Sequence, residues 1–574
     1  MDNFTIARIF REIADLLEIK GENPFKIRAY RGAADSVADC PESVARLSPE
    51  ERRRLPGIGK DLALKLTELV DTGELTYHRE LLAEFPPSIL DILRLQGVGP
   101  KTVALLYREL NVRTLDDLES AARAGRLRGI KGMGAKKETL ILKAIDEQRQ
   151  SQGRRLTAEA HDVAAILVAH LRALAPDALI LPVGSLRRGC ETCGDLDILA
   201  AGGDPPLMDA FAGHALVERV LGRGDTKSSV LLRGGFQADL RVVPSDSAGA
   251  AMQYFTGSKA HNIALRDRAI QRGYKLNEYG LFDNATGARV AGENEEGIYA
   301  ALDLALVPPE LRENRGEIPA AERRELPRLI EEADIRGDLH MHTTRTDGRA
   351  DAETMARAAK ELGREYIAIT EHSRSLAMAS GLDETAALEH AARVRALNGR
   401  IEGLRVLAGI ECDILPDGRL DLADDCLAEL DYVVASVHSA FNQGEAQMTD
   451  RVLRALSCPW VDALGHPTGR LLLRREGYPL RLEQVATEAA RLGAALEINC
   501  LPDRLDLSDV NARLARDRGA KIVISTDAHA PVALGGIRWG VIVARRGWLR
   551  QEDVLNTLPF DAFRASLRRA RSGG

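Results

Sequence analysis

The sequence predicts a multidomain chain that combines two fold classes, α+β in its first part and α/β in its last. Its 574 residues exceed one typical domain several times over. Glycine turns, each followed by a helical stretch, recur in the first 150 residues. Further on, short apolar runs of strand length alternate with helical stretches such as 352–362 and 482–492, which predicts a parallel sheet.

The charge distribution indicates which part of the chain could bind a nucleic acid, and the cysteine content indicates whether the thiols are reduced. The formal net charge is −7, yet residues 1–155 carry 27 basic and 24 acidic side chains, so the acidic excess lies in the rest of the chain. The N-terminal part is therefore the part expected to face a nucleic acid. The seven cysteines are scattered and odd in number, which is typical of reduced thiols. No long apolar run and no secretory leader occurs, so we expect a cytoplasmic protein without a membrane span.

Three similar turns organise the N-terminal third. Each has two glycines flanked by apolar residues and precedes a predicted helix: 55–60, 95–101 and 130–136. Glycine permits left-handed backbone angles, and the free amides at the start of the next helix can bind a phosphate. One such turn is usually a helix connector, but three copies resemble the helix-hairpin-helix motif, which binds the DNA backbone without reading sequence. The predicted DNA contacts are Gly57, Gly59, Gly97, Gly99, Gly132 and Gly134, with positive charge from Lys60, Lys101, Lys136 and Lys137.

The middle of the chain carries a cluster of carboxylates. An apolar run ends in Gly184-Ser185, and Asp195 and Asp197 follow two residues apart on a predicted strand, so their side chains share one face. Asp239, on another predicted strand, can complete a cluster of three. Such a cluster is costly unless cations neutralise it, and two magnesium ions held by carboxylates and phosphates would do so. A lone Asp-x-Asp is typical of a turn, but this combination resembles the nucleotidyltransferase fold, in which the serine binds triphosphate.

Nine candidate metal ligands lie in the last part of the chain, all but one at or just past the end of a predicted strand. In a parallel β/α barrel the chemistry collects at this end of the strands. A single histidine there is usually a satisfied polar residue, but the repetition favours metals. Imidazole together with carboxylate suits zinc, manganese or iron. Nine ligands are too many for one tetrahedral ion, which takes four, so we expect two or three metals. The nine are His340, His342, Asp347, His372, Glu411, His438, His466, Asp527 and His529.

Seven strand-like runs are predicted in this region. His340 and His342 are two residues apart, which on a strand places both side chains on one face, where they can share a metal. The sixth run, 494–499, brings no evident ligand and only Asn499 at its end. Clustered metals activate water and stabilise both oxygens of a phosphoryl displacement, so the chemistry indicated is hydrolysis of a phosphate ester.

The middle segment resembles the family X DNA polymerases of the polymerase beta type. The resemblance rests on the Gly-Ser pair, the three aspartates and the segment 254–258, Tyr-Phe-Thr-Gly-Ser. It implies that Asp195, Asp197 and Asp239 are catalytic and hold Mg²⁺ or Mn²⁺. The nucleotide contacts that it implies are Ser185, Arg188, Tyr254, Phe255, Gly257, Lys259 and Asn262.

The resemblance also implies that several of these residues select the nucleotide. Tyr254 and Phe255 would lie under the deoxyribose and exclude a 2′-hydroxyl. Asn262 would touch the base edge in the minor groove, and Arg266 would lie near the template. The animal enzyme has aspartate where this chain has Lys259, and a cation there implies direct binding of a triphosphate in the absence of DNA.

The N-terminal segment fits the same family. Residues 23–31 resemble the 5′-phosphate pocket of its small domain, which implies DNA contacts by Lys26 and Tyr30. Lys65 matches the lysine that forms a Schiff base in its deoxyribose-phosphate lyase. A supporting lysine four residues earlier is Asp61 here, and a solvated helix lysine is an equally good interpretation of Lys65.

The last part resembles the polymerase-and-histidinol-phosphatase (PHP) domain over about residues 335–570. Its motifs stand here as HxH, an aspartate five residues on, TEH, IE, SVH, GHP and TDAH, and every ligand position is filled. The resemblance implies a distorted (β/α)7 barrel, a trinuclear site of zinc, manganese or iron, and a metal-dependent phosphoesterase. On DNA this chemistry would be that of a 3′–5′ exonuclease or phosphodiesterase, and the same chemistry could incise abasic sites.

Combined, the resemblances predict a bacterial family X repair polymerase with a C-terminal PHP domain, acting as a monomer on gapped or nicked DNA with dNTPs. Two other functions stay open: a barrel that hydrolyses a small phosphate ester such as histidinol phosphate, and a polymerase half that only binds DNA and delivers a nuclease. The predicted borders are 1–85 for a small helical domain, 86–154 for a helical DNA-binding subdomain, 155–245 for the palm, 246–315 for a nucleotide-selecting thumb-like subdomain, 316–335 for a linker and 336–574 for the PHP domain.

Overall fold

The structure, a computed structural model, describes residues 3–38, 40, 44–86, 88–93, 95, 98–130, 133–151, 153–202, 206–376 and 379–568. The chain forms two compact units, residues 1–152 and 153–574. The six predicted domains and segments divide the chain more finely than this, and their borders stay predictions. None of the described helices is long and apolar enough to cross a membrane.

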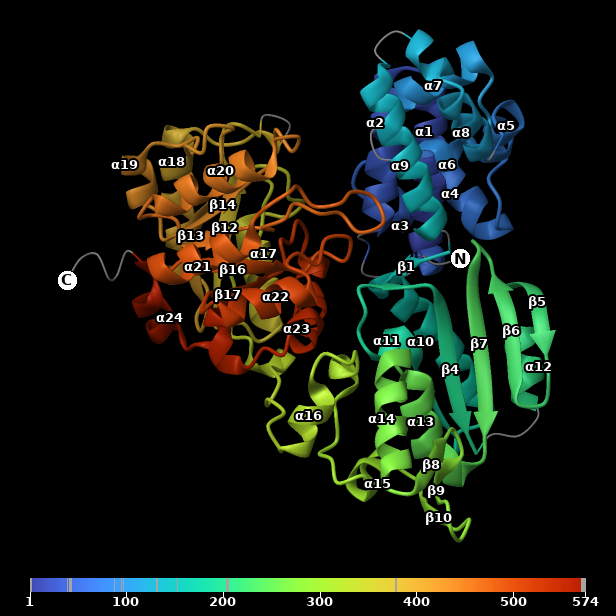
Figure 1. Ribbon diagram of the computed structural model, residues 1–574. Helices are drawn as coiled ribbons and strands as arrows, with labels where there is room; N and C mark the ends of the chain where they lie inside the picture. The colour runs from blue at the N-terminus through green and yellow to red at the C-terminus, as the bar shows by residue number, and fades with distance from the viewer. Residues whose placement is uncertain are drawn as a thin grey trace. The chain divides into compact units, whose positions relative to one another are not determined.

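Within its described residues, the first unit contains only helices as regular elements, drawn in blue to cyan in Figure 1. They are α1 (Asn3–Lys20), α2 (Pro24–Ala38), α3 (Pro49–Arg54), α4 (Lys60–Thr72), α5 (Thr76–Glu84), α6 (Ile89–Leu93), α7 (Pro100–Leu110), α8 (Leu115–Arg123) and α9 (Ala135–Ser151). The apolar residues Ile6, Phe10, Ile13 and Leu17 recur along one face of α1 and are fully buried. One continuous core joins the helices of this unit.

A mixed five-stranded sheet forms the first part of the second unit. The elements are β1 (Arg155–Leu156), α10 (Thr157–Leu174), β2 (Leu179–Pro182), α11 (Gly184–Arg187), β3 (Thr192–Cys193), β4 (Asp195–Ala201), α12 (Pro206–Ala212), β5 (Val217–Arg223), β6 (Lys227–Leu232) and β7 (Phe236–Val243). The strand order is β2-β4-β7-β6-β5. Alternate residues of β4 face opposite sides: Ile198 packs with α10 and α12, and Leu199 packs with α13 (Ala248–Thr256). Strands β4 and β7 run parallel, which places Asp197 directly opposite Asp239.

A smaller subdomain follows, built on a three-stranded antiparallel sheet. Its elements after α13 are α14 (Lys259–Gln271), β8 (Tyr274–Asn277), β9 (Gly280–Asp283), β10 (Arg289–Ala291), α15 (Glu295–Ala301) and α16 (Glu317–Glu322). The segment predicted as a linker contains the short helix α16, but it is packed: Ala321 lies in the core of this subdomain, and Ile330 lies in the core of the C-terminal barrel. Trp548 of the barrel joins the subdomain core, so the two share a buried surface.

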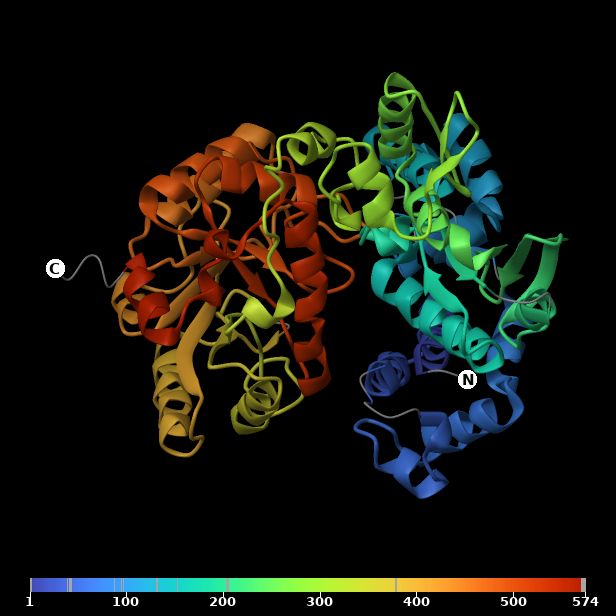
Figure 2. The same ribbon diagram turned by 90° about the horizontal axis from the view of Figure 1, so that it is seen from below.

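Seven parallel strands form the C-terminal barrel, with the helices around them (Figures 1 and 2). The elements are β11 (Gly337–Asp338), α17 (Ala352–Glu361), β12 (Tyr366–His372), α18 (Glu384–Ala396), β13 (Arg405–Asp413), α19 (Asp424–Ala428), β14 (Tyr432–Ser436), α20 (Glu445–Ser457), β15 (Ala463–Leu464), α21 (Leu482–Leu492), β16 (Ala495–Asn499), α22 (Asp509–Asp517), β17 (Lys521–Ser525), α23 (Ile537–Arg546) and α24 (Phe560–Ser566). All strands follow one another in sheet order, which confirms the predicted (β/α)7 fold.

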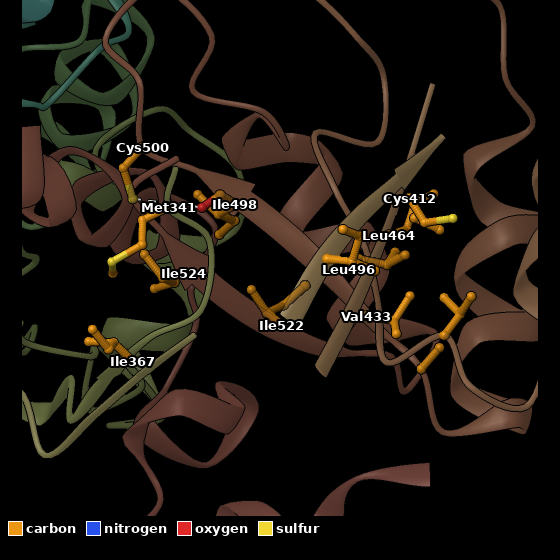
Figure 3. Packing of buried hydrophobic residues seen from close by; sticks show 14 of the residues in the cluster. Met341, Ile367, Cys412, Val433, Leu464, Leu496, Ile498, Cys500, Ile522 and Ile524 are labelled. Atoms are coloured by element: carbon orange, nitrogen blue, oxygen red, sulfur yellow. Dashed lines mark hydrogen bonds between the residues drawn. The ribbon is translucent and has the colours of Figure 1, made fainter. Parts of the chain in front are cut away.

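Each strand of the barrel has an outer and an inner face. Ile367 belongs to the large apolar cluster that the strands share with the helices (Figure 3), whereas Tyr366 and Ala368 belong to a separate inner cluster. The first and last strands are linked, because Asp338 accepts hydrogen bonds from the backbone amide of Thr526 at 3.0 Å and from its hydroxyl at 2.6 Å. The inner face leads to the C-terminal ends of the strands, where the candidate ligands lie.

The first strand is shorter than the ligand spacing predicted. Strand β11 ends at Asp338, so His340 and His342 lie beyond it, and a strand is not the reason that they share a site. Only Met341 continues the pairing, through an isolated bridge to Ala528. The backbone leaves the regular alternation there, yet the centroids of the two imidazole rings are 5.2 Å apart.

Candidate active sites

Glu411, on β13, is the centre of the ligand cluster in the barrel. It faces the interior and is 2% exposed. Its carboxylate lies 2.9 Å from Nδ1 of His372 and 3.0 Å from Nε2 of His466. Three further Nε2 atoms surround it, at 3.3, 3.3 and 3.5 Å, from His340, His438 and His342.

Two other carboxylates complete the cluster. Asp347 lies 3.4 Å from Nε2 of His372 and 3.4 Å from Nε2 of His529. Asp527 lies 3.2 Å from Nε2 of His342. Three overlapping groups of these residues bring their ligand atoms close enough to hold an ion. All nine residues singled out from the sequence therefore converge at one end of the barrel.

Carboxylates behind the cluster orient two of the histidines. Oε1 of Glu497 lies 2.7 Å from Nδ1 of His340, and Oδ1 of Asp413 lies 2.7 Å from Nδ1 of His438. Each contact leaves the opposite nitrogen turned toward Glu411, and such contacts fix the tautomer of metal-binding imidazoles. The sequence prediction missed both carboxylates. For Glu497 a signal was present, because it is the one charged residue in the apolar sixth strand.

The cluster is a dense array of opposite charges. Burial alone would raise the pKa of Glu411, but the neighbouring histidines hold it well below its ordinary value. Burial also opposes the charge of the histidines, yet contact with Glu411 and a second carboxylate raises the pKa of His372 to about 10 and that of His438 to about 9. Burial, then the charges of two other histidines, lowers the pKa of His342 to about 4. The carboxylates therefore stay ionised and attract cations.

Buried ring nitrogens that face carboxylates without making a hydrogen bond indicate that these residues fit metal ions. Nε2 of His340, Nδ1 of His372 and both ring nitrogens of His342 are buried and make no hydrogen bond within the described part of the chain. Unsatisfied buried polar atoms are costly, and a divalent metal is the partner that imidazole and carboxylate donors share. His466 and Asp527 also have positive φ angles of 26° and 53°, which are often found where function fixes a side chain.

Three aspartates meet on adjacent strands of the palm. Asp195 and Asp197 lie on β4, and Asp197 is opposite Asp239 on β7. Gly184, which begins α11, has a φ of 63°, and a Cβ there would collide with the Asp197 carboxylate. Glycine is therefore needed where the Gly-Ser turn meets the carboxylates. The structure brings together the cluster that the sequence predicted.

The palm carboxylates differ in their electrostatic environment. Burial, followed by the charges of Asp195 and Asp239, raises the pKa of Asp197 to about 6. Burial opposes the charge of Asp239 too, but hydrogen bonds from Lys227 and Gln237 lower its pKa. Nζ of Lys227 lies 2.5 Å from Oδ2 of Asp239, and Nε2 of Gln237 donates to Oδ1 at 3.0 Å. The sequence prediction missed Lys227, because only the register of β6 against β7 places it there.

The residues predicted to select the nucleotide lie at the end of α13, beside the Gly-Ser turn. Nη1 of Arg188 donates to the carbonyl oxygen of Thr256 at 2.5 Å, which ties the turn to this segment. Nδ2 of Asn262 donates to the carbonyl oxygen of Tyr254 at 2.7 Å. The rings of Tyr254 and Phe255 meet edge to face, with centroids 5.1 Å apart. The other predicted contacts lie on α11, at the α13–α14 junction and on α14: Ser185, Gly257, Lys259 and Arg266.

In the helical unit, the residues predicted to form the phosphate and lyase pocket lie together. Nζ of Lys26 lies 2.7 Å from the hydroxyl of Tyr77. Nζ of Lys65 is 4.7 Å from the ring centroid of Tyr77 and 5.4 Å from that of Tyr30. Asp61 lies 2.6 Å from the same Nζ. Burial opposes the charge of Lys65, but Asp61 and Tyr30 raise its pKa.

The glycine turns open helices as predicted where they are described. Gly59 and Gly99 are the N-cap residues of α4 and α7, and neither provides a side chain for the first amides of its helix. Those amides are available to a phosphate. Gly134 directly precedes α9, and Gly57 has a φ of 71°. Gly97 and Gly132 lie outside the described residues.

Family models match this arrangement along the chain. A helix-hairpin-helix domain matches residues 1–75, and a SAM-like helix-hairpin-helix tandem matches residues 89–147. The DNA polymerase beta palm matches residues 156–221, and the DNA polymerase beta thumb matches residues 251–313. The PHP domain matches residues 338–500.

A relative of nearly equal length decides the family. A protein of Bacillus subtilis (strain 168) named DNA polymerase/3′-5′ exonuclease PolX is 37% identical over 567 residues, 98% of this chain and 99% of that protein. The chain belongs to the PolX family of DNA polymerases. Proteins named probable phosphatase from Thermoanaerobacter sp. (strain X514) and Shewanella sediminis (strain HAW-EB3) are 29% and 30% identical over 231 and 232 residues. These matches cover 38% and 39% of this chain and 89% of each relative, whereas the PolX match spans both catalytic parts.

Proposed function

We propose that this member of the PolX family fills gaps in DNA at the palm carboxylates and removes nucleotides from 3′ ends in the PHP barrel. One observation carries the proposal: both ligand sets are assembled in a chain that resembles PolX over 98% of its length. A fold alone would not support a function, but two assembled sites do. Gapped or nicked DNA, a repair role and a monomeric state belong to the same proposal.

At the palm, the three aspartates would hold Mg²⁺ or Mn²⁺ together with the phosphates of a dNTP. When bound, such ions neutralise the charge that develops during phosphoryl transfer. Asp239 is the carboxylate that Lys227 keeps ionised, so it is suited to hold a cation beside the primer 3′-hydroxyl. The Gly-Ser turn and Arg188 would position the triphosphate.

Tyr254 and its neighbours would choose the nucleotide. The Asn262 side chain holds the backbone carbonyl of Tyr254, which fixes the end of α13 where the sugar would lie. A 2′-hydroxyl would meet the backbone or the ring of Tyr254 there. Lys259 is exposed in the first turn of α14, free of the buried ion pairs, and would add a contact to the triphosphate.

In the barrel, the nine ligands would hold two or three ions of zinc, manganese or iron. When bound, these ions supply an activated water and stabilise the leaving oxygen of a phosphodiester. Glu411 would bridge them, since five imidazoles surround it. Glu497 and Asp413 would hold two of the rings in place. Hydrolysis of an internal phosphodiester beside an abasic site is the same chemistry on another substrate.

One assay tests both activities: gapped DNA labelled at the primer 5′ end, with Mn²⁺, with and without dNTPs. Asp239→Ala should lose extension and keep shortening, and His340→Ala should do the reverse. Asp209→Ala and His170→Ala remove a carboxylate and an imidazole elsewhere in the palm and serve as matched controls. Extension by Asp239→Ala would contradict the assignment of DNA synthesis to the palm carboxylates. Shortening that survives in His340→Ala, or hydrolysis of histidinol phosphate without action on DNA, would overturn the nuclease assignment.

Lys65 carries a second proposed activity, that of a 5′-deoxyribose-phosphate lyase. The observation that favours it is the pocket of Tyr30, Tyr77 and Lys26 around the amine. A Schiff base needs a neutral amine, however, and Asp61 stabilises the charged form. Borohydride trapping on DNA with a 5′-deoxyribose phosphate should therefore be weak in the wild type, absent in Lys65→Ala and stronger in Asp61→Ala. Equal trapping by Lys65→Ala would assign the reaction to another amine.

A further inference from the structure

The Gly-Ser turn of the palm rests directly on a helix of the PHP barrel. Gly189 follows this turn with a φ of 66°, and a Cβ there would collide with the side chain of Ile542 on α23. Arg546, the last residue of α23, donates from Nη1 to the carbonyl oxygen of Arg188 at 2.7 Å. The backbone that carries Arg188 is therefore held by the barrel.

Around this contact, positive and negative side chains alternate. Oε1 of Glu313 accepts from Nε of Arg188 at 3.0 Å and from Nη1 of Arg546 at 3.0 Å. Nη2 of Arg546 lies 2.9 Å from Oδ2 of Asp509, which Arg315 also contacts at 2.9 Å. The side chains of Arg546 and Glu313 are 6% and 17% exposed, so solvent screens their interaction only weakly. Burial opposes ionisation of Glu313, but Arg188 and Arg546 hold its pKa below the ordinary value.

We propose that Arg546 of the barrel is a positioning residue for DNA synthesis, which neutralises Glu313 and thereby leaves Arg188 available to a nucleoside triphosphate. The inference rests on the proposed role of Arg188 at the triphosphate. Arg188 has its Nε on Glu313 and its Nη1 on the Thr256 carbonyl, so an incoming triphosphate must compete with Glu313 for the guanidinium. Arg546 supplies the charge that lets Glu313 release it.

Removal of Arg546 would change this competition. Glu313 would keep Arg188 as its neighbouring cation, and a mostly buried carboxylate holds its remaining counter-charge more tightly. Arg188 would then bind a triphosphate less readily, so the KM for dNTPs rises. The aspartates are untouched, and the rate of the chemical step at saturating dNTP is retained.

The test is gap filling by full-length Arg546→Met, with Arg545→Met as the matched control. Arg545 lies on the same helix and crosses the same surface to Glu310 at 2.7 Å, and its other contact is the Ile330 carbonyl. We expect Arg546→Met to raise the dNTP KM roughly ten-fold, with kcat within about two-fold, and Arg545→Met to leave KM unchanged. A wild-type KM in Arg546→Met overturns the inference, as does an equal rise in the control.

Rescue separates positioning from a merely structural role. Glu313→Gln removes the competing charge, so the double variant with Arg546→Met should return KM toward the wild-type value. Glu313→Gln alone should lower KM, which tests the competition even if Arg546→Met does not fold, as judged by thermal unfolding. No rescue, or no fall in KM for the single variant, overturns the inference.

Arg188→Met distinguishes this inference from the function on which it rests. If Arg188→Met leaves the dNTP KM unchanged, Arg188 does not bind the triphosphate, and both ideas fail. If Arg188→Met raises KM and Arg546→Met does not, the triphosphate role stands and only the coupling to the barrel fails.

Discussion

The palm and the barrel assemble their candidate metal ligands in different ways. The palm presents three carboxylates on two parallel strands, with Asp195 exposed and Lys227 as the close counter-charge of Asp239. The barrel gathers six histidines and three carboxylates, and the residues at its centre are at most 2% exposed: His340, His342, Glu411 and His466.

This difference in ligands and burial indicates how each site would hold its metal ions. Oxygen ligands near solvent suit a hydrated Mg²⁺ that arrives with the phosphates of a substrate. Buried imidazoles, oriented by further carboxylates, suit an ion that stays in the protein. The two activities should therefore depend on separate residues and respond separately to substitution.

Glu411→Gln should reduce the nuclease activity of the barrel and leave the polymerase activity of the palm unchanged. The substitution keeps the shape of the side chain and removes the charge that five imidazoles share. We expect 3′-end shortening to fall about 10³-fold or more and dNTP extension to stay within about two-fold, both measured on gapped DNA. Equal loss of the two activities would show that the sites are not independent.

Glu497→Gln should affect the barrel alone, because its carboxylate holds the His340 ring, whereas the candidate palm ligands are carboxylates. Loss of the carboxylate behind His340 should reduce shortening roughly 10- to 100-fold. Gln237→Ala removes the donor to Asp239 and is the matched palm variant, for which we expect extension to fall only a few-fold. Full nuclease activity in Glu497→Gln would contradict the proposed orientation of His340.

Tyr254→Ala should relax the choice of nucleotide in the palm without effect in the barrel. Insertion of ribonucleotides relative to dNTPs should rise roughly ten-fold, since the side chain that meets the 2′-hydroxyl is gone. Removal of ribonucleotide-ended and deoxynucleotide-ended primers should not change. Tyr279→Ala, an exposed tyrosine of the same subdomain, is the control. Unchanged discrimination in Tyr254→Ala would remove this residue from the sugar pocket.

Acid stability should depend on a buried ion pair near the palm, which contacts neither set of candidate metal ligands. Burial opposes the charge of Glu295, but Arg187 and Arg312 lower its pKa from 4.5 to about 2. A carboxylate with a depressed pKa stabilises the fold above its unfolded pKa and loses this contribution as pH falls through the folded value. Between about pH 4.5 and 2 the loss is on the order of 3 kcal/mol. Urea unfolding should show it in the wild type and not in Glu295→Gln; identical pH profiles would contradict the assignment.

The sequence predicted the main architecture because its signals are local. Apolar runs followed by polar residues gave the seven strands, and His372, for example, directly ends β12. The helical unit and the two strands that carry Asp197 and Asp239 followed from equally local patterns, whereas the parallel pairing of these strands was not predicted. The roles of the nine ligands and of the palm residues stay predictions, although the structure brings these residues together.

What could not be predicted depends on register and on contacts across elements. Lys227 reaches Asp239 only through the pairing of β6 with β7, and Asp413 reaches His438 only through the pairing of β13 with β14. The short strand β11 also follows from pairing, because Met341 meets Ala528 in a single bridge. No periodicity in the chain encodes these distances.

The metal content of the full-length protein after gel filtration in metal-free buffer is the most direct test of the central claim, that the barrel keeps its metals and the palm does not. We predict that the wild type and Asp239→Ala both retain two or more transition-metal ions per chain, and that Glu411→Gln loses them. Retention that is unchanged in Glu411→Gln, or that is lost in Asp239→Ala, would contradict this division between the two sites.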